Sequence, residues 1–120
     1  MTTARIRRLN DACRYWAIRL QLAGRTAAAA RFGRIQITAG VAALAVDVET
    51  ILRLVMNVRT FTRGNDLYGE HDFGTLEHES SRILWKIEYY APDLCHGSED
   101  PADPDKTMRV LTIMLAEEYC

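Results

Sequence analysis

Apolar residues in the first third of the chain recur at intervals of three and four, which places them on one stripe of an amphipathic helix. The residues at this spacing are Ile6, Leu9, Cys13, Trp16 and Leu20. Arginines surround the stripe. Gly24 weakens this helix, because glycine costs a helix about 1 kcal/mol relative to alanine. The helix either breaks there or continues through the alanine run 27–30. We therefore predict an arginine-rich helical region over residues 1–32.

Strict alternation of polar and apolar residues replaces this spacing in two later segments. Residues 34–38 alternate as a short strand, and residues 83–90 place Ile83, Trp85 and Ile87 on one face, as a strand buried on one side does. The run 72–77 precedes this strand, and polar residues 78–81 between them suit a hairpin connection. The pattern predicts one short strand and one antiparallel hairpin.

Helical spacing returns in two further segments. The first is residues 45–61, with Asp47 and Glu49 in the first turn and Arg59 in the last, an arrangement that the helix dipole favours. The second begins with Asp103 as N-cap and Pro104 as the first helical residue, and we expect it to continue to about Tyr119. A strand over residues 110–115 is the alternative for this last segment, because it is rich in β-forming residues.

The predicted order is helix, strand, helix, strand, strand, helix. This order indicates an α+β fold with a small, largely antiparallel sheet of about three strands packed against helices. At 120 residues and 48% hydrophobic composition, the chain fits one domain over 1–120, with residues 33–120 as its α+β core. No apolar run approaches the roughly 20 residues of a membrane span, and three widely spaced cysteines fit neither a disulfide framework nor a zinc pattern. We predict a cytoplasmic protein with reduced thiols, no membrane partner and no cofactor.

The near-zero net charge hides an opposition between the two halves of the chain. Residues 1–63 contain 11 arginines and 3 acids, whereas residues 64–120 contain 4 basic and 13 acidic residues. Opposite charges let the halves attract each other within one chain or between copies in a homo-oligomer. A basic face also suits nucleic acid, and an acidic face suits a nucleic-acid-binding protein by imitating phosphate.

Two loops combine histidine with carboxylates. The first contains Asp66, Glu70, His71 and Asp72, and the second contains Asp93, His96, Glu99 and Asp100. Histidines with carboxylates ligate divalent metals, and a histidine beside an aspartate serves as a general base. Structural turn chemistry is the alternative, since these residue types also cap turns. None of the common metal or nucleotide motifs is present, so we assign no metal site.

Three long motifs carry a resemblance to a known family. They are GNDLYGEHDFG, WKIEYY and LCHGSEDPADPDKTMRVLTIMLAEEY. Together they resemble an uncharacterised bacterial domain family of unknown function, mostly alphaproteobacterial and often encoded by accessory or plasmid-borne genes. The likeness covers residues 33–119 and, more loosely, the opening RIRRLNDA, whereas residues 15–31 look longer than the link usual in that family.

Three functional hypotheses follow. The lead is a non-enzymatic protein–protein interaction protein of the bacterial accessory genome, a counter-defence inhibitor whose acidic surface (Asp66, Glu70, Asp93, Glu99 and Asp100) occupies another protein's nucleic-acid-binding site. The first alternative is a nucleic-acid-binding module that uses Arg5, Arg8, Arg14 and Arg19. The second is a metal-dependent hydrolase centred on His71 and His96, with Asp72 orienting His71.

Overall fold

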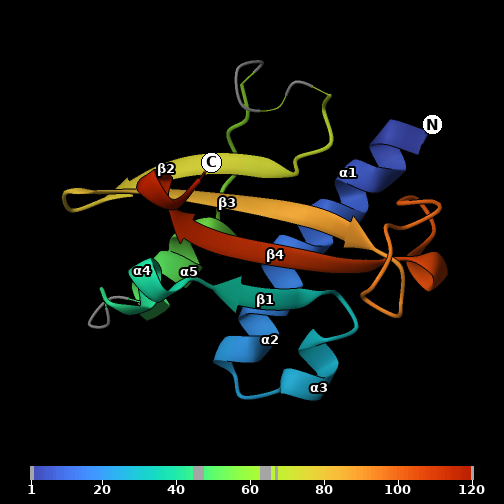
Figure 1. Cartoon of the computed structure of the whole chain (residues 1–120), viewed down its shortest axis with the longest axis horizontal. Helices are drawn as coiled ribbons and strands as arrows, with labels where there is room; N and C mark the ends of the chain where they lie inside the picture. The colour runs from blue at the N-terminus through green and yellow to red at the C-terminus, as the bar shows by residue number, and fades with distance from the viewer. Residues whose placement is uncertain (1, 45–47, 63–65, 67, 120) are drawn as a thin grey trace.

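Helices lie against one face of a four-stranded sheet (Figure 1). The computed structural model describes residues 2–44, 48–62, 66 and 68–119. Its α-helices are α1 (Thr2–Ala12), α2 (Ile18–Leu22), α3 (Thr26–Ala29), α4 (Ala39–Ala42) and α5 (Val48–Met56). A π-helical segment, η1 (Cys13–Ala17), joins α1 to α2, and single 3₁₀ turns are η3 (Pro104–Lys106) and η4 (Ala116–Glu118). The strands are β1 (Arg34–Ile37), β2 (Phe73–His78), β3 (Ser81–Tyr90) and β4 (Met108–Leu115).

The strands are ordered β1-β4-β3-β2 across the sheet. β1 runs parallel to β4, whereas the β2–β3 and β3–β4 pairs are antiparallel. In this register Trp85 of β3 lies between Gly74 of β2 and Ile113 of β4. A side chain on Gly74 would meet the Trp85 ring at 2.5 Å, so the glycine provides the space that the indole occupies.

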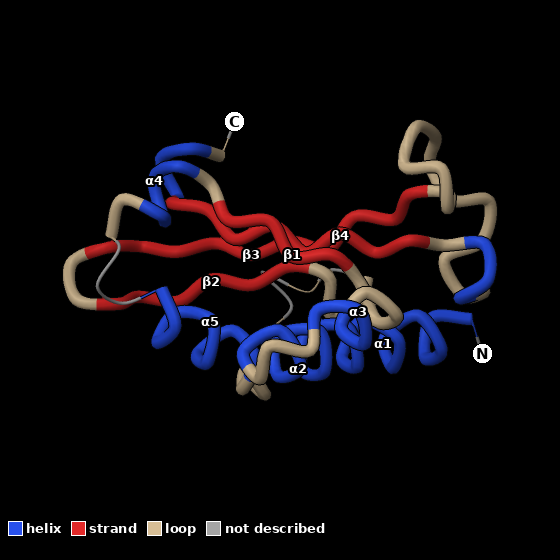
Figure 2. The backbone as a smooth tube through the Cα atoms, turned by 90° about the horizontal axis from the view of Figure 1, so that it is seen from below, coloured by secondary structure: helices blue, strands red, loops and turns tan. Residues whose placement is uncertain are grey.

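Figure 2 shows α1, α2, α3 and α5 on one side of the sheet, and α4 on the other side at one end. Ile83, Trp85 and Ile87 of β3 point toward this helix layer and are buried with Ile51 and Val55 of α5. The helix layer and the sheet are held together because each buries apolar surface against the other. The core also includes Cys13 and Ile18, so the arginine-rich N-terminal region packs into the same core as the sheet.

The predicted α+β class, the strand at 34–38 and the hairpin are confirmed, but the last element was predicted wrongly. Residues 108–115 form the strand β4, and Asp103 and Pro104 open only one 3₁₀ turn. β4 has a paired neighbour on each side, and its residues 109–114 are all buried. A strand buried on both faces loses its alternation and resembles a broad helical stripe. The sheet therefore has four strands instead of about three.

The helical region differs from the predicted stripe in which residues it buries. Trp16 is 42% exposed, and the buried positions instead include the polar residues Asn10 and Arg14. Burial of a polar group is tolerated when it is hydrogen-bonded, and both residues have partners, described below. Of the two alternatives left open at Gly24, the structure shows the break: Gly24 has φ +78° and lies between α2 and α3. The predicted helix 45–61 appears as α5, which ends at Met56; residues 45–47 lie outside the described residues.

Candidate functional site

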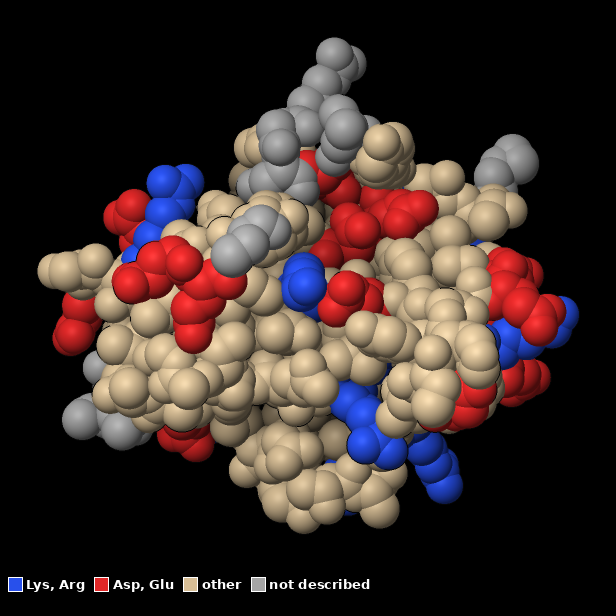
Figure 3. Space-filling model, viewed as in Figure 1, with Lys and Arg blue, Asp and Glu red and all other residues tan. Residues whose placement is uncertain are grey.

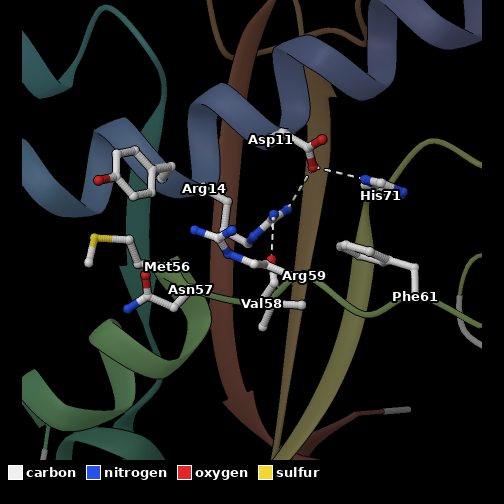
Figure 4. Close-up of a pocket in the computed structure, with 9 residues that line it drawn as sticks. Asp11, Arg14, Met56, Asn57, Val58, Arg59, Phe61 and His71 are labelled. Atoms are coloured by element: carbon white, nitrogen blue, oxygen red, sulfur yellow. Dashed lines mark hydrogen bonds and ion pairs between the residues drawn. The ribbon is translucent and has the colours of Figure 1, made fainter.

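The first candidate site is a pocket of about 290 Å³ beside His71, between η1 and the segment that follows α5 (Figure 4). His71 Nδ1 is 2.9 Å from Asp11 Oδ1, and Nε2 is 3.4 Å from Asp66 Oδ2. One face of the imidazole stacks on Phe61, with 3.7 Å between the ring centroids and 2° between the planes. Both ring nitrogens therefore face a carboxylate, and this arrangement orients the ring and holds its loop against α1.

Arg14 forms the wall of this pocket and is 4% exposed. Its guanidinium donates to Asp11 Oδ1 at 3.2 Å and to the Val58 carbonyl at 3.1 Å. The cation also lies over the rings of Phe61 and Trp85, at 5.3 and 5.1 Å. Burial lowers the pKa of Arg14, and the neighbouring Asp11 partly offsets this effect. Arg14 thus connects η1 to the segment after α5 and to β3, and it is not presented to solvent.

A second buried polar network surrounds Asn10, which is fully buried. Its Nδ2 donates to the Glu70 carbonyl at 2.9 Å and to the Tyr89 hydroxyl at 2.7 Å, while its Oδ1 accepts from Arg109 Nε at 2.6 Å. Tyr89 donates onward to Glu70 Oε1 at 2.9 Å, and Arg109 reaches the Pro101 carbonyl at 2.6 Å. The network therefore joins α1, β3 and β4 to both acidic loops.

Both loops are also anchored to α1 by arginines. Arg5 Nε donates to the Ala102 carbonyl and Arg7 Nε to the Gly69 carbonyl, each at 2.6 Å. The two acidic loops thus meet α1 two residues apart, through their backbones. The N-terminal arginines in these contacts hold carbonyl groups and leave the carboxylates to other partners.

The predicted catalytic histidines have separate partners. His96 is exposed, and its Nδ1 lies 2.8 Å from Asp93 Oδ2, a contact within its own loop. Hydrogen bonds from the Cys95 amide and from His96 lower the pKa of Asp93. Burial raises the pKa of Asp72, and the nearby Glu70 and Asp66 raise it further. Within the part of the chain that the structure describes, no three His, Cys, Asp or Glu residues are placed to hold a metal ion.

The predicted partner-binding acids divide into two groups. Asp66 and Glu70 make internal contacts with His71 and Tyr89, so these carboxylates serve the fold. Asp93 and Glu99 are exposed on the second loop, where Asp100 accepts from the Ala102 amide at 3.1 Å. The exposed carboxylates of the two loops are therefore on the second loop, and Asp93 is also hydrogen-bonded within that loop.

The second candidate site is formed by η1 and the turn that follows α3. Trp16 and Phe32 stack there with 6.3 Å between ring centroids and an interplanar angle of 28°, and they are 42% and 37% exposed. The exposed arginines of this layer and its adjoining turns are Arg5, Arg8, Arg19, Arg25, Arg31, Arg53 and Arg59. We call the surface formed by Trp16, Phe32, Arg8, Arg19 and Arg31 the basic–aromatic face.

Few acids oppose the charge of this layer. Among the described residues 2–44 and 48–62 the acids are Asp11 and Glu49, which pair with Arg14 and Arg53. Figure 3 shows the other side of the molecule, where acidic side chains predominate over the upper half and both ends and basic ones gather toward the lower edge, near β1 and α3. In the folded protein, acidic and basic side chains therefore lie largely on different parts of the surface, as they lie largely in different halves of the sequence.

Gly33 explains how Phe32 comes to lie beside Trp16. A side chain at Gly33 would meet Cys13 Sγ at 2.6 Å and the Arg109 carbonyl at 3.0 Å. The glycine lets the turn after α3 pack directly on η1 and β4, which brings the preceding Phe32 next to the neighbouring turn of η1. The sequence signal that was missed is the triplet Arg31-Phe32-Gly33 directly after the alanine run.

Of the arginines predicted to bind nucleic acid, Arg8 and Arg19 are exposed on the basic–aromatic face. Arg19 also donates to the Tyr15 hydroxyl at 3.2 Å, which keeps it beside the aromatic cluster. Arg14 is buried in the first pocket, and Arg5 is bound to the Ala102 carbonyl. Two of the four predicted arginines are therefore presented to solvent in this cluster, and among the described residues neither has a backbone carbonyl partner.

Comparison with known protein families shows to which family the chain belongs. A family model described as protein of unknown function (DUF3768) matches residues 37–118. The chain belongs to this family. Membership in a family of unknown function was implied by the three sequence motifs, and it is confirmed; the bacterial and accessory-genome origin stays a prediction. The DUF3768 match begins at the last residue of β1, so α1, η1, α2 and α3 precede it.

No curated protein and no solved structure matches the chain. Among the described residues, no helix has the length and apolar character needed to cross a membrane.

Proposed function

We propose that this DUF3768 protein is a non-enzymatic binding module whose basic–aromatic face contacts nucleic acid. The observation that carries the proposal is the coincidence of an exposed aromatic stack, Trp16 and Phe32, with exposed arginines on a surface whose described acids are paired. Arginine neutralises backbone phosphates, and aromatic rings stack on bases.

The shape of the helix layer supports this assignment. Arg8, Trp16 and Arg19 are exposed along the continuous α1–η1–α2 segment, and Arg31 follows α3 beside Phe32. A nucleic acid laid along this segment would meet several arginines in succession. Binding through such contacts releases condensed counterions and therefore weakens steeply as salt rises.

The proposal is tested with fluorescently labelled oligonucleotides, titrated at about 50 mM salt, where such electrostatic binding is strong. We expect the double variant Arg19→Ala/Arg31→Ala to bind more weakly than the wild type by tenfold or more. Arg82→Ala is the matched control, because Arg82 is an exposed arginine at the start of β3, in the hairpin rather than the helix layer. If the wild type binds no oligonucleotide at this salt concentration, the proposed function is wrong.

A second function is supported by the acidic loop after β3. Asp93 and Glu99 are exposed there, and the Cys95 and His96 amides donate hydrogen bonds to Asp93 Oδ1, which fixes the loop conformation. A fixed array of carboxylates suits a basic surface on another protein, which is the counter-defence interaction that charge asymmetry favours. Affinity purification with and without nuclease separates the two functions: a protein retained after nuclease treatment and lost in Asp93→Ala/Glu99→Ala supports the second.

A further inference from the structure

We infer that the basic–aromatic face binds single-stranded nucleic acid, with unpaired bases stacked on Trp16 and Phe32 and received by the groove next to them. This inference rests on the proposed function and names its substrate class. The groove has a volume of about 350 Å³, and Phe32 forms part of its wall together with Leu9, Arg31 and Met108. Its size falls in the range of pockets that hold small ligands, about 300–1,000 Å³.

The aromatic stack is what favours single strands. Bases paired within a duplex already stack on each other and present only their edges, so a protein ring stacks on a base only when that base is unpaired. Tyr15 contacts Trp16 edge-on, with 5.1 Å between centroids, and Phe32 lies nearly parallel to Trp16. The indole is held by two rings and remains 42% exposed, which suits a stacking platform.

The charges around the groove indicate where the phosphates and where the bases of the strand lie. Arg31 lines the groove, and Arg8 is exposed on α1 one turn before Ala12, another wall residue. Asp105 is exposed and follows Pro104, another residue that lines the groove. We therefore place the phosphates along the arginine side and the bases toward Phe32 and Met108, away from the carboxylate.

The platform is preorganised by the turn after α3. The amides of Phe32 and Gly33 both donate to the Ala29 carbonyl, at 2.9 and 3.3 Å. Gly33 is buried against Cys13 and the Arg109 backbone. A surface already fixed in its binding conformation loses less entropy when the ligand binds.

The test compares labelled oligothymidylate, oligouridylate and a duplex of equal length, titrated into the full chain. We expect both single strands to bind more tightly than the duplex. Trp16→Ala and Phe32→Ala should each weaken single-strand binding by about 5- to 160-fold, the range for one base–aromatic stack, and Trp16→Tyr should retain most of the affinity. Leu54→Ala is the control, because Leu54 is as exposed as Trp16 and lies on α5 of the same layer.

Intrinsic fluorescence gives a second readout. Trp16 is exposed and Trp85 is fully buried, so stacking of a base should quench the Trp16 emission and leave that of Trp85. We expect quenching by unlabelled oligothymidylate in the wild type and its loss in Trp16→Tyr. Unchanged melting temperatures of the variants establish that the fold is intact.

Several results would overturn the inference. Equal affinity for duplex and single strand, with less than a twofold effect of Trp16→Ala, contradicts base stacking and leaves the proposed function standing. No binding to any oligonucleotide contradicts both. Binding of polyglutamate, with the same dependence on Trp16 and no oligonucleotide binding, assigns the face to an acidic protein instead.

Discussion

The arginines of the helix layer fall into two groups that differ in what they contact. Arg14 is buried, and its guanidinium has a carboxylate, a backbone carbonyl and two aromatic faces around it. Arg8 and Arg31 are exposed and lie next to the Trp16–Phe32 stack and its groove. One group holds the acidic loops and the sheet to α1, and the other is left for a ligand. An excess of arginine in the sequence therefore indicates nucleic-acid binding only if enough of the arginines are exposed and are not used in contacts that hold the fold together.

The largest effect is expected from breaking the interior network. Asn10→Ala removes one partner from Arg109 Nε, the Tyr89 hydroxyl and the Glu70 carbonyl in a fully buried place. Each of these buried groups then lacks a hydrogen-bond partner, and the Arg109 guanidinium is charged. We therefore expect the free energy of unfolding to fall by about 3 kcal/mol. Urea denaturation measures this loss.

Arg8→Ala is the control from the exposed group, and we expect it to change the free energy of unfolding by less than about 0.5 kcal/mol. Equal losses in Asn10→Ala and Arg8→Ala would contradict the division between structural and free polar residues.

A smaller loss is expected at the junction of the two regions. Gly33→Ala introduces a methyl group 2.6 Å from Cys13 Sγ and 3.0 Å from the Arg109 carbonyl. Overpacking of this kind costs about 1–3 kcal/mol. Gly97→Ala is the matched control, since a side chain there meets nothing within 4 Å. A Gly33→Ala protein with the same urea midpoint as Gly97→Ala would show that the turn does not pack as described.

The smallest effect concerns the pH dependence of stability. Burial raises the pKa of Asp72 above its usual value of 3.8. A raised pKa means that the folded state favours the protonated carboxyl, so stability falls as pH rises through that pKa. Asp72→Asn should therefore raise the urea midpoint at pH 7 and leave it nearly unchanged well below pH 3.8.

Asp93→Asn is the contrasting variant, because hydrogen bonds lower the pKa of Asp93. A lowered pKa stabilises the fold above the usual value and loses this effect in acid. Asp93→Asn should thus lower the midpoint at pH 7. Shifts of the same sign in both variants would be incompatible with the different surroundings of the two carboxyl groups.

Local patterns predicted most of the fold. Alternation located β3 and its hairpin partner, because one face of β3 is buried and the other is only partly so. The same logic failed for β4, where side chains on both faces are buried and the apolar run is continuous. Whether such a run becomes a strand depends on neighbours, here β1 and β3, that local spacing does not reveal.

The sites were less predictable because they depend on contacts between distant residues. Arg14 was predicted to bind nucleic acid and Asn10 was assigned no role, but their partners Tyr89, Glu70 and Val58 are 44 or more residues away in the chain. Trp16 read as core, yet it is exposed beside Phe32. Tertiary contacts decided which polar residues were buried and which aromatic residues stayed outside.

The central claim is that the free arginines of the basic–aromatic face bind nucleic acid. The most direct test is the slope of log affinity against log salt concentration for a single-stranded oligonucleotide, compared between the wild type and Arg8→Ala/Arg19→Ala/Arg31→Ala. Each phosphate contact contributes about 0.7 to the slope for single strands, so three lost contacts should make the slope shallower by about 2. An unchanged slope would show that these arginines contact no phosphate and would contradict the account.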